Sequence, residues 1–193
     1  MKDIEKYYEI TKNTPPHPLV KELMKMKITP QNAIDLGCGS GKDTVFLIKN
    51  GWNVLAIDQE NTKDMIEQRL TEIERKKFRF KIQKFEEVEL EKNDLLVANF
   101  SIPFCNKNYF EEFWKKITNS ILEKGYFIGN FFGEHDSWNE IKENMVFLSK
   151  EQVLNLFEKE FKIVEYHEIE KDGNVGLGKR KHWHIYNIMA QKI

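Results

Sequence analysis

The segment from residue 32 to residue 58 constrains the fold more than any other part of this chain. It reads NAIDLGCGSGKDTVFLIKNGWNVLAID, in which two short apolar runs flank a cluster of glycines and a run of helix formers. We expect a strand over 33–36, a helix over 44–50 that ends at Gly51, and a second strand over 54–57. This order of elements predicts an α/β fold.

Three glycines at alternate positions, Gly37, Gly39 and Gly41, follow the first expected strand. Glycine reaches the backbone angles of a sharp turn without a side-chain clash, and its bare backbone lets a ligand approach closely. The free N–H groups at the start of the next helix then face that ligand. Asp35 precedes the turn, and Asp58 closes the second strand, where an acid can accept both hydroxyl hydrogens of a ribose.

A dinucleotide site uses similar parts and is the alternative. Its Gly-x-Gly-x-x-Gly fingerprint would place a third glycine at position 42, which is Lys42 in this chain. An acid beside the turn suits a ligand with a positive amino group and would repel a pyrophosphate. S-adenosylmethionine has an amino acid end, a sulfonium and a ribose but no phosphate, so the pattern favours it. An NAD-type oxidoreductase stays as the second hypothesis.

The stretch IDLGCGSGKDT, followed by VLAID, resembles the first two motifs of the class I S-adenosylmethionine-dependent methyltransferases. The resemblance implies a Rossmann-like, seven-stranded, mostly parallel sheet with helices on both faces, whose last strand returns antiparallel between strands five and six. It also implies that the turn and the acid before it hold the methionine end of the cofactor, and that Asp58 holds the ribose. The cofactor-binding candidates in this region are Asp35, Gly37, Cys38, Gly39, Ser40, Gly41, Asp43, Asp58 and Gln59.

Two further pairs of residues are cofactor-binding candidates. In the family, the adenine ring is held just after the third strand, where Phe85 and Glu86 stand in this chain. The apolar run at 95–98 predicts a buried fourth strand, and Asn99 and Ser101 follow it. Ligands of open α/β sheets bind where the strand order reverses, so we expect both residues near the reacting methyl group.

The first 30 residues are expected to form a helical cap on an α/β core at 31–193, within a single domain. Helical spacing predicts short helices over 2–10 and 19–26, separated by a proline-rich break. The tyrosine pair, the break and the second helix are similar to the tellurite-resistance and thiopurine-like branches, which act on small molecules. His17 lies in the break and becomes a catalytic candidate because the cap should overhang the methyl group, although a histidine hydrogen-bonded in a loop is the alternative.

The remaining elements are expected from periodicity. A helical face spans 65–73, and a charged edge strand spans 75–82, where lysines and arginines discourage pairing between sheets. A helix over 109–122 should end at Gly125, before a strand over 126–132. A helix that starts at Ser149 and strands over 161–169 and 184–190 complete the chain.

Residues 171–181 are expected to form a glycine-rich loop that folds over the substrate, or else an exposed connection. In the first case, Lys179, Arg180 and Lys181 would favour an anion. His182 and His184 share a face of the following strand, and His182 is the second catalytic candidate, as a substrate contact. Two histidines without a third ligand make a poor zinc site, so we expect no metal.

Composition narrows the choice of partner and compartment. The net charge of −1 gives no argument for a nucleic-acid or membrane partner. The two cysteines, Cys38 and Cys105, favour a reducing cytoplasm, and no apolar run approaches the ~18 residues of a membrane span. We expect a monomer or homodimer that moves a methyl group to a small-molecule or oxyanion acceptor by in-line displacement, leaving S-adenosylhomocysteine. A non-catalytic S-adenosylmethionine-binding module is the third hypothesis.

Overall fold

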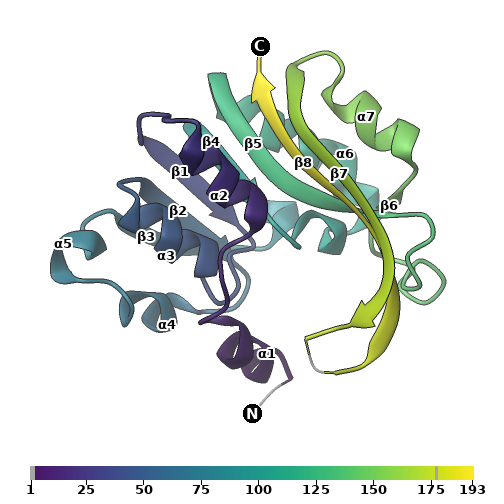
Figure 1. The fold of residues 1–193 in the computed structure, drawn as a ribbon, viewed down its shortest axis with the longest axis horizontal. Coiled ribbons are helices and arrows are strands. Elements are labelled where there is room, and N and C mark those ends of the chain that lie inside the picture. Colours follow the sequence, from purple (N-terminus) through teal and green to yellow (C-terminus); the bar gives the residue numbers. More distant parts are fainter. Residues whose placement is uncertain (1–2, 177) are drawn as a thin grey trace.

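One twisted sheet organises the computed structural model, which describes residues 3–176 and 178–193 (Figure 1). Its strand order is β3-β2-β1-β4-β5-β8-β7, and a short β6 pairs with β5. The strands are β1 (Asn32–Leu36), β2 (Asn53–Asp58), β3 (Phe78–Ile82), β4 (Asn93–Ala98), β5 (Ile121–Gly133), β6 (Phe147–Leu148), β7 (Phe161–Asn174) and β8 (Arg180–Lys192). β8 runs antiparallel to both β5 and β7, and the first five strands pair in parallel. The Rossmann-like fold is confirmed, with two-residue β6 added to the seven expected strands.

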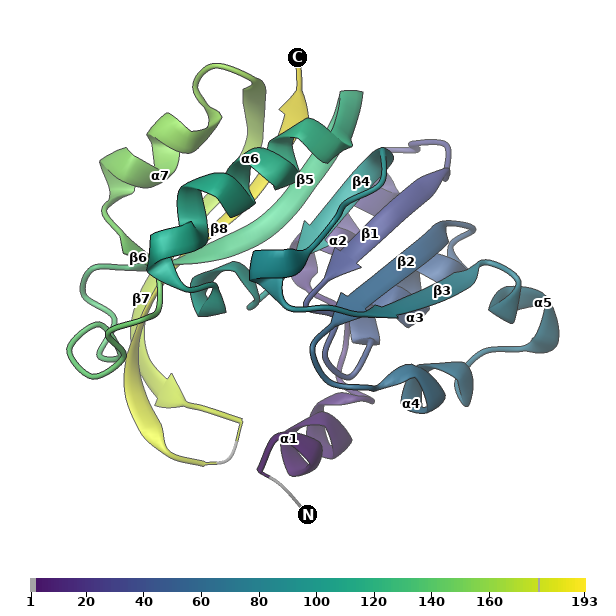
Figure 2. The same ribbon diagram turned by 180° about the vertical axis from the view of Figure 1, so that it is seen from behind.

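Helices cover both faces of the sheet. The α-helices are α1 (Asp3–Thr11), α2 (Pro18–Lys25), α3 (Lys42–Lys49), α4 (Lys63–Glu67), α5 (Glu72–Arg75), α6 (Phe110–Ser120) and α7 (Lys150–Phe157). The 3-10 turns are η1 (Phe85–Glu87), η2 (Ile102–Phe104) and η3 (Lys107–Tyr109). α2 and α3 lie on one face, and α6 and α7 lie on the other (Figure 2). No helix of the described ranges combines the length and the apolar character that a bilayer crossing requires.

Each face of the sheet has its own hydrophobic core, because side chains alternate along a strand. Ile34 of β1 packs in the core that α6 and α7 cover, and its neighbour Ala33 packs in the core beneath α2 and α3. α6 contributes Trp114, whose ring lies 5.3 Å from Phe127 of β5 and 5.2 Å from Phe157 of α7. This burial holds the carboxyl ends of β1, β2 and β4 at one edge of the sheet.

Two helical expectations were wrong. The single helix expected over 65–73 is divided into α4 and α5, and Ile73 is 75% exposed. Thr71 explains the division, since its hydroxyl and the Glu74 carboxylate form a capping box that starts a new helix. α6 ends at Ser120, and Gly125 lies inside β5 rather than at the end of the helix.

Residues 171–176 and 178–181 belong to a hairpin rather than to the expected loop. β7 and β8 pair through Asp172–His182 to Asn174–Arg180, and the Val175 N–H closes the turn on the Lys179 carbonyl at 2.8 Å. Asp172 and His182 lie opposite each other with Oδ1 and Nδ1 2.9 Å apart, a cross-strand contact of the kind that stabilises a ladder. Lys2 of the first expected helix and Leu177 of the expected loop lie outside the described residues. The hairpin curves past the sheet to α1 (Figures 1 and 2).

Candidate functional site

The glycine turn lies between β1 and α3, as expected, in a backbone conformation that favours glycine. The φ angles of Gly37, Gly39 and Gly41 are +72°, +51° and +73°, all in the left-handed region. The Gly37 and Cys38 N–H groups donate to the Ile57 carbonyl at 2.8 and 3.1 Å, which ties the turn to the end of β2. A Cβ on Gly37 would lie 2.3 Å from the Ser101 Cβ, and one on Gly41 would meet a side-chain carbon of α4 at 2.3 Å.

Asp35 and Asp43 place two buried carboxylates beside this turn. Asp35 is 3% exposed, and its Oδ2 accepts the Thr44 hydroxyl at 2.5 Å. Burial, together with the nearby Asp43 charge, raises the pKa of Asp35 to about 7. Asp43 accepts the His17 N–H at 2.7 Å and the Asn99 amide at 2.8 Å, so one carboxylate joins the cap, α3 and the end of β4.

Asp58 ends β2 at the mouth of the turn. Its carboxylate accepts the Gly39 N–H at 2.8 Å, the Glu60 N–H at 3.0 Å and the Tyr8 hydroxyl at 3.4 Å. Burial raises the pKa of Asp58, and these hydrogen bonds oppose that rise. Gln59, the next residue, is exposed.

α1 closes over the turn. Gly39 lies against the Tyr8 ring, since a Cβ there would be 3.2 Å from it. Thr11 donates its hydroxyl to Ser40 Oγ at 3.1 Å, and Arg69 reaches back to the Ser40 carbonyl. α1 also contacts the tip of the β7–β8 hairpin through Tyr7. Gly176 lies so close to the Tyr7 ring that a Cβ on it would be 2.4 Å from a ring carbon. The glycine turn is therefore covered by α1.

The candidates after β3 diverge. Phe85 faces the turn, where its ring would lie 3.2 Å from a Cβ on Gly37, and it packs on Phe113 of α6 at 5.1 Å. Glu86 accepts the Asn106 N–H at 3.4 Å, from the segment before η3. Phe85 therefore contacts the turn, whereas the Glu86 carboxylate is hydrogen-bonded to the segment before η3.

Buried polar groups gather after β4. Asn99 Oδ1 and Ser101 Oγ are enclosed and have no hydrogen-bond partner among the described residues. Between them, Phe100 has a φ of +52°, and its N–H donates to Asn130 Oδ1 at 2.7 Å. Asn130 is wholly buried in β5, and it was not selected as a site residue from the sequence. The signal in the sequence was a single amide within the apolar run FIGNFF.

Aromatic side chains form a wall next to Phe100. The Phe100 ring is 37% exposed and lies 6.2 Å from Trp183 and 6.4 Å from Phe132. The expected anion-binding role of Lys181 does not fit its surroundings: Nζ lies 2.5 Å from Asp136 Oδ1 and 3.8 Å from the Trp183 ring centre. Burial lowers the pKa of Lys181, and the Asp136 carboxylate opposes that change. Because the Lys181 ammonium is already paired with Asp136, it is not available to a substrate anion.

The two catalytic candidates lie in different surroundings. His17 is buried, its Nδ1 accepts the Leu19 N–H at 3.3 Å to cap α2, and its ring lies 6.3 Å from Phe100. Burial lowers the pKa of His17, against the Asp43 charge and a hydrogen bond with Asn187. His182 contacts acids of β7, with Nδ1 2.9 Å from Asp172 Oδ1. It points to the opposite face of β8 from Trp183, because adjacent side chains alternate.

Comparison with known proteins supplies a family. The model of the family described as tellurite resistance protein TehB matches residues 1–177. No curated protein sequence matches the chain.

Solved methyltransferase structures share the fold. TehB from Haemophilus influenzae has a TM-score of 0.74 and 19% identity, over 98% of this chain and 67% of that one. The 1,6-didemethyltoxoflavin-N1-methyltransferase of Burkholderia thailandensis, with S-adenosylhomocysteine bound, has a TM-score of 0.68 and 18% identity, over 91% and 77% of the two chains. The N-methyltransferase NodS of Bradyrhizobium japonicum, also with S-adenosylhomocysteine, has a TM-score of 0.65 and 11% identity, over 99% of each chain.

Proposed function

The chain belongs to the family of tellurite resistance protein TehB, and on that premise we propose that it transfers a methyl group from S-adenosylmethionine to a small acceptor. The strongest support is the set of buried carboxylates Asp35, Asp43 and Asp58 around a turn of bare backbone. Within residues 3–176 and 178–193, none of the three has a salt-bridge partner. Buried carboxylates without a cationic partner are costly to ionise, which supports a cationic ligand at this site. S-adenosylmethionine supplies an ammonium and a sulfonium.

Each group around the turn has a role in this proposal. Asp58 accepts the two ribose hydroxyls, in place of the Tyr8 hydroxyl that it now holds at 3.4 Å. Asp35 and Asp43 attract the ammonium of the methionine end, and Phe85 packs on the adenine. Because Tyr8 lies on Gly39, the cofactor enters only after α1 has moved outward.

The methyl group would then point past Asn99 and Ser101 to the aromatic wall. The acceptor lone pair forms the new bond to carbon while the S–CH3 bond breaks, and sulfur keeps the electron pair as S-adenosylhomocysteine leaves. The wall of Phe100, Phe132 and Trp183 excludes water and orients the acceptor. Orientation of this kind contributes up to about 7–11 kcal/mol in favourable systems.

The acceptor is proposed to need no proton removal. His17 Nδ1 accepts the Leu19 N–H, and the ring is buried as the cap of α2, so we assign His17 a positioning role. His182 faces away from the wall. An acceptor that is already anionic, such as an oxyanion or a thiolate, fits such a site because it has no proton to lose. The family description makes tellurite the first acceptor to test.

Isothermal titration with S-adenosylhomocysteine tests the cofactor site. We expect saturable binding by the intact chain, and we expect Asp58→Ala to weaken it by more than about 10-fold, because even one hydrogen bond to a charged group contributes about 1.5–3 kcal/mol. Asp64→Asn is the matched control, since Asp64 is an exposed acid on α4 and should leave the affinity unchanged.

Other outcomes would separate the alternatives. No binding of S-adenosylhomocysteine would overturn the proposal, and saturable binding of NADH at micromolar concentration would favour an oxidoreductase. Binding without transfer of labelled methyl to tellurite, thiols or amines would favour a module that only binds the cofactor.

A further inference from the structure

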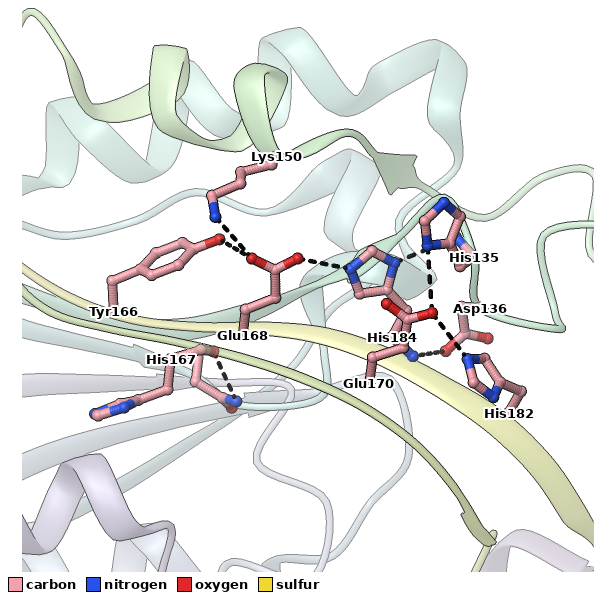
Figure 3. A network of polar contacts seen from close by, with 10 residues as sticks. His135, Asp136, Lys150, Tyr166, His167, Glu168, Glu170, His182 and His184 are labelled. Carbon is pink, nitrogen blue, oxygen red and sulfur yellow. Dashed lines mark hydrogen bonds and ion pairs between the residues drawn. The ribbon is translucent and has the colours of Figure 1, made fainter.

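The β7–β8 hairpin carries acids and histidines on a single face (Figure 3). In the antiparallel register, Glu170 lies directly opposite His184, and Asp172 lies opposite His182. Because every second residue of a strand shares a face, Glu168 joins the same row. Lys150 of α7 bonds to Glu168 at 3.0 Å, so this row lies on the α7 side of the sheet.

A third chain segment brings His135 to this row. His135 follows β5, and its Nδ1 lies 3.3 Å from Glu170 Oε1. Its ring stacks on His184 with the ring centres 4.9 Å apart. One ligand atom from each of His135, Glu170 and His184 lies within 4.8 Å of the other two. Three potential metal ligands thus converge from two strands and a turn.

The His184 ring is already oriented as metal-binding histidines are. Its Nε2 lies 3.3 Å from Glu168 Oε1, and the Tyr166 hydroxyl fixes that carboxylate at 3.0 Å. With the proton on Nε2, the Nδ1 lone pair of His184 points to the cluster and can bind a metal ion. In this structure Nδ1 accepts a long hydrogen bond, 3.3 Å, from the backbone N–H of His135. Carboxylates commonly orient histidine ligands in this way. Gly133 makes room for the ring, since a Cβ there would lie 2.2 Å from Nδ1.

We propose that His135, Glu170 and His184 bind one divalent ion of the zinc class, with water in the remaining position. Imidazole and carboxylate are zinc ligands at about 2.0–2.2 Å, and a tetrahedral ion would hold them roughly 3.4 Å apart. Ligand atoms that are now up to 4.8 Å apart must therefore come closer by up to about 1.4 Å. Exposed side chains can make that movement, and the side chains of His135 and Glu170 are 63% and 42% exposed.

The expectation of no metal rested on His182 and His184 alone. The missing ligands come from elsewhere in the chain, from the turn after β5 and from β7. The ion would tie that turn to the hairpin. Trp138 of the turn already packs on Trp183 of the aromatic wall, with the ring centres 5.8 Å apart. Zinc binding would therefore hold the acceptor side of the molecule together, independently of the cofactor.

Titration of chelator-treated protein with zinc ion alone tests the site, and cobalt substitution supplies a visible d–d spectrum. We expect one equivalent to bind. Glu170→Gln and His135→Ala should each weaken binding by more than about 100-fold, since removal of even an outer-shell partner typically costs 10–100-fold. His167→Ala is the matched control: His167 is an exposed histidine on the same strand, paired with Glu165 at 3.2 Å but outside the cluster.

Equal zinc affinity in Glu170→Gln and in the unmodified chain, or less than one equivalent bound, would overturn the proposal and leave a polar network only. An unchanged far-UV circular dichroism spectrum of both ligand variants shows that they are folded. Failure of the methyltransferase assignment would appear in the S-adenosylhomocysteine titration and would leave the zinc result intact.

Discussion

At the scale of the residue, Asp35 is the most informative side chain of the proposed cofactor site. Burial raises its pKa to about 7, so the folded chain favours its neutral form. This contribution to stability is complete below the ordinary pKa near 4 and is lost as the pH rises through about 7. A cationic cofactor would reverse the preference, because it stabilises the carboxylate.

Cofactor binding should therefore release a proton from Asp35. We expect the affinity for S-adenosylhomocysteine to rise as the pH increases from about 5 to about 7 and then to level off. Calorimetry in buffers of different ionisation enthalpy measures the released proton. Asp35→Asn should remove the pH dependence, and a flat profile for the unmodified chain would contradict the assignment of Asp35.

At the scale of the element, α1 is a short helix that covers the glycine turn and buries few of its own side chains. Nine residues are too few for a helix to be stable alone, and Tyr8 is the buried residue of α1. Tyr8 contacts Gly39 and Asp58, which are groups that the cofactor would use. The opening of α1 should therefore limit how fast the cofactor enters.

Tyr8→Ala should speed the association of S-adenosylhomocysteine several-fold in stopped-flow measurements, because the side chain that competes for Asp58 is gone. Ile10→Ala is the control on the same helix, since Ile10 is 52% exposed, and it should leave the rate unchanged. An association rate that Tyr8→Ala does not alter would show that α1 does not gate the site.

At the scale of the whole molecule, the cofactor would connect the ends of β1, β2 and β4, which support both hydrophobic cores. A ligand present at 100 times its Kd stabilises the folded state by about 2.7 kcal/mol. For a chain of this size that corresponds to a rise in Tm of roughly 5–10 °C, which differential scanning calorimetry with S-adenosylhomocysteine measures. Asp58→Ala should lose most of this shift, and an unchanged Tm for the parent chain would contradict specific binding.

The methyltransferase fold and the glycine turn were predictable because their signals are local. Left-handed angles at Gly37, Gly39 and Gly41 follow from backbone sterics, and Asp58 follows from its place at the end of an apolar run. The hairpin was not predictable in the same way, because glycines at 173, 176 and 178 indicate a loop, whereas pairing across the strands keeps residues 171–174 extended.

The sequence by itself determined the kind of fold and the carboxylate-lined turn, since both depend on the conformational preferences of neighbouring residues. Only the tertiary structure decided that Tyr8 covers the turn, that Asp136 neutralises Lys181, and that His135 joins Glu170 and His184. These contacts join segments far apart in the chain. They depend on strand order and register, which no single stretch of sequence encodes.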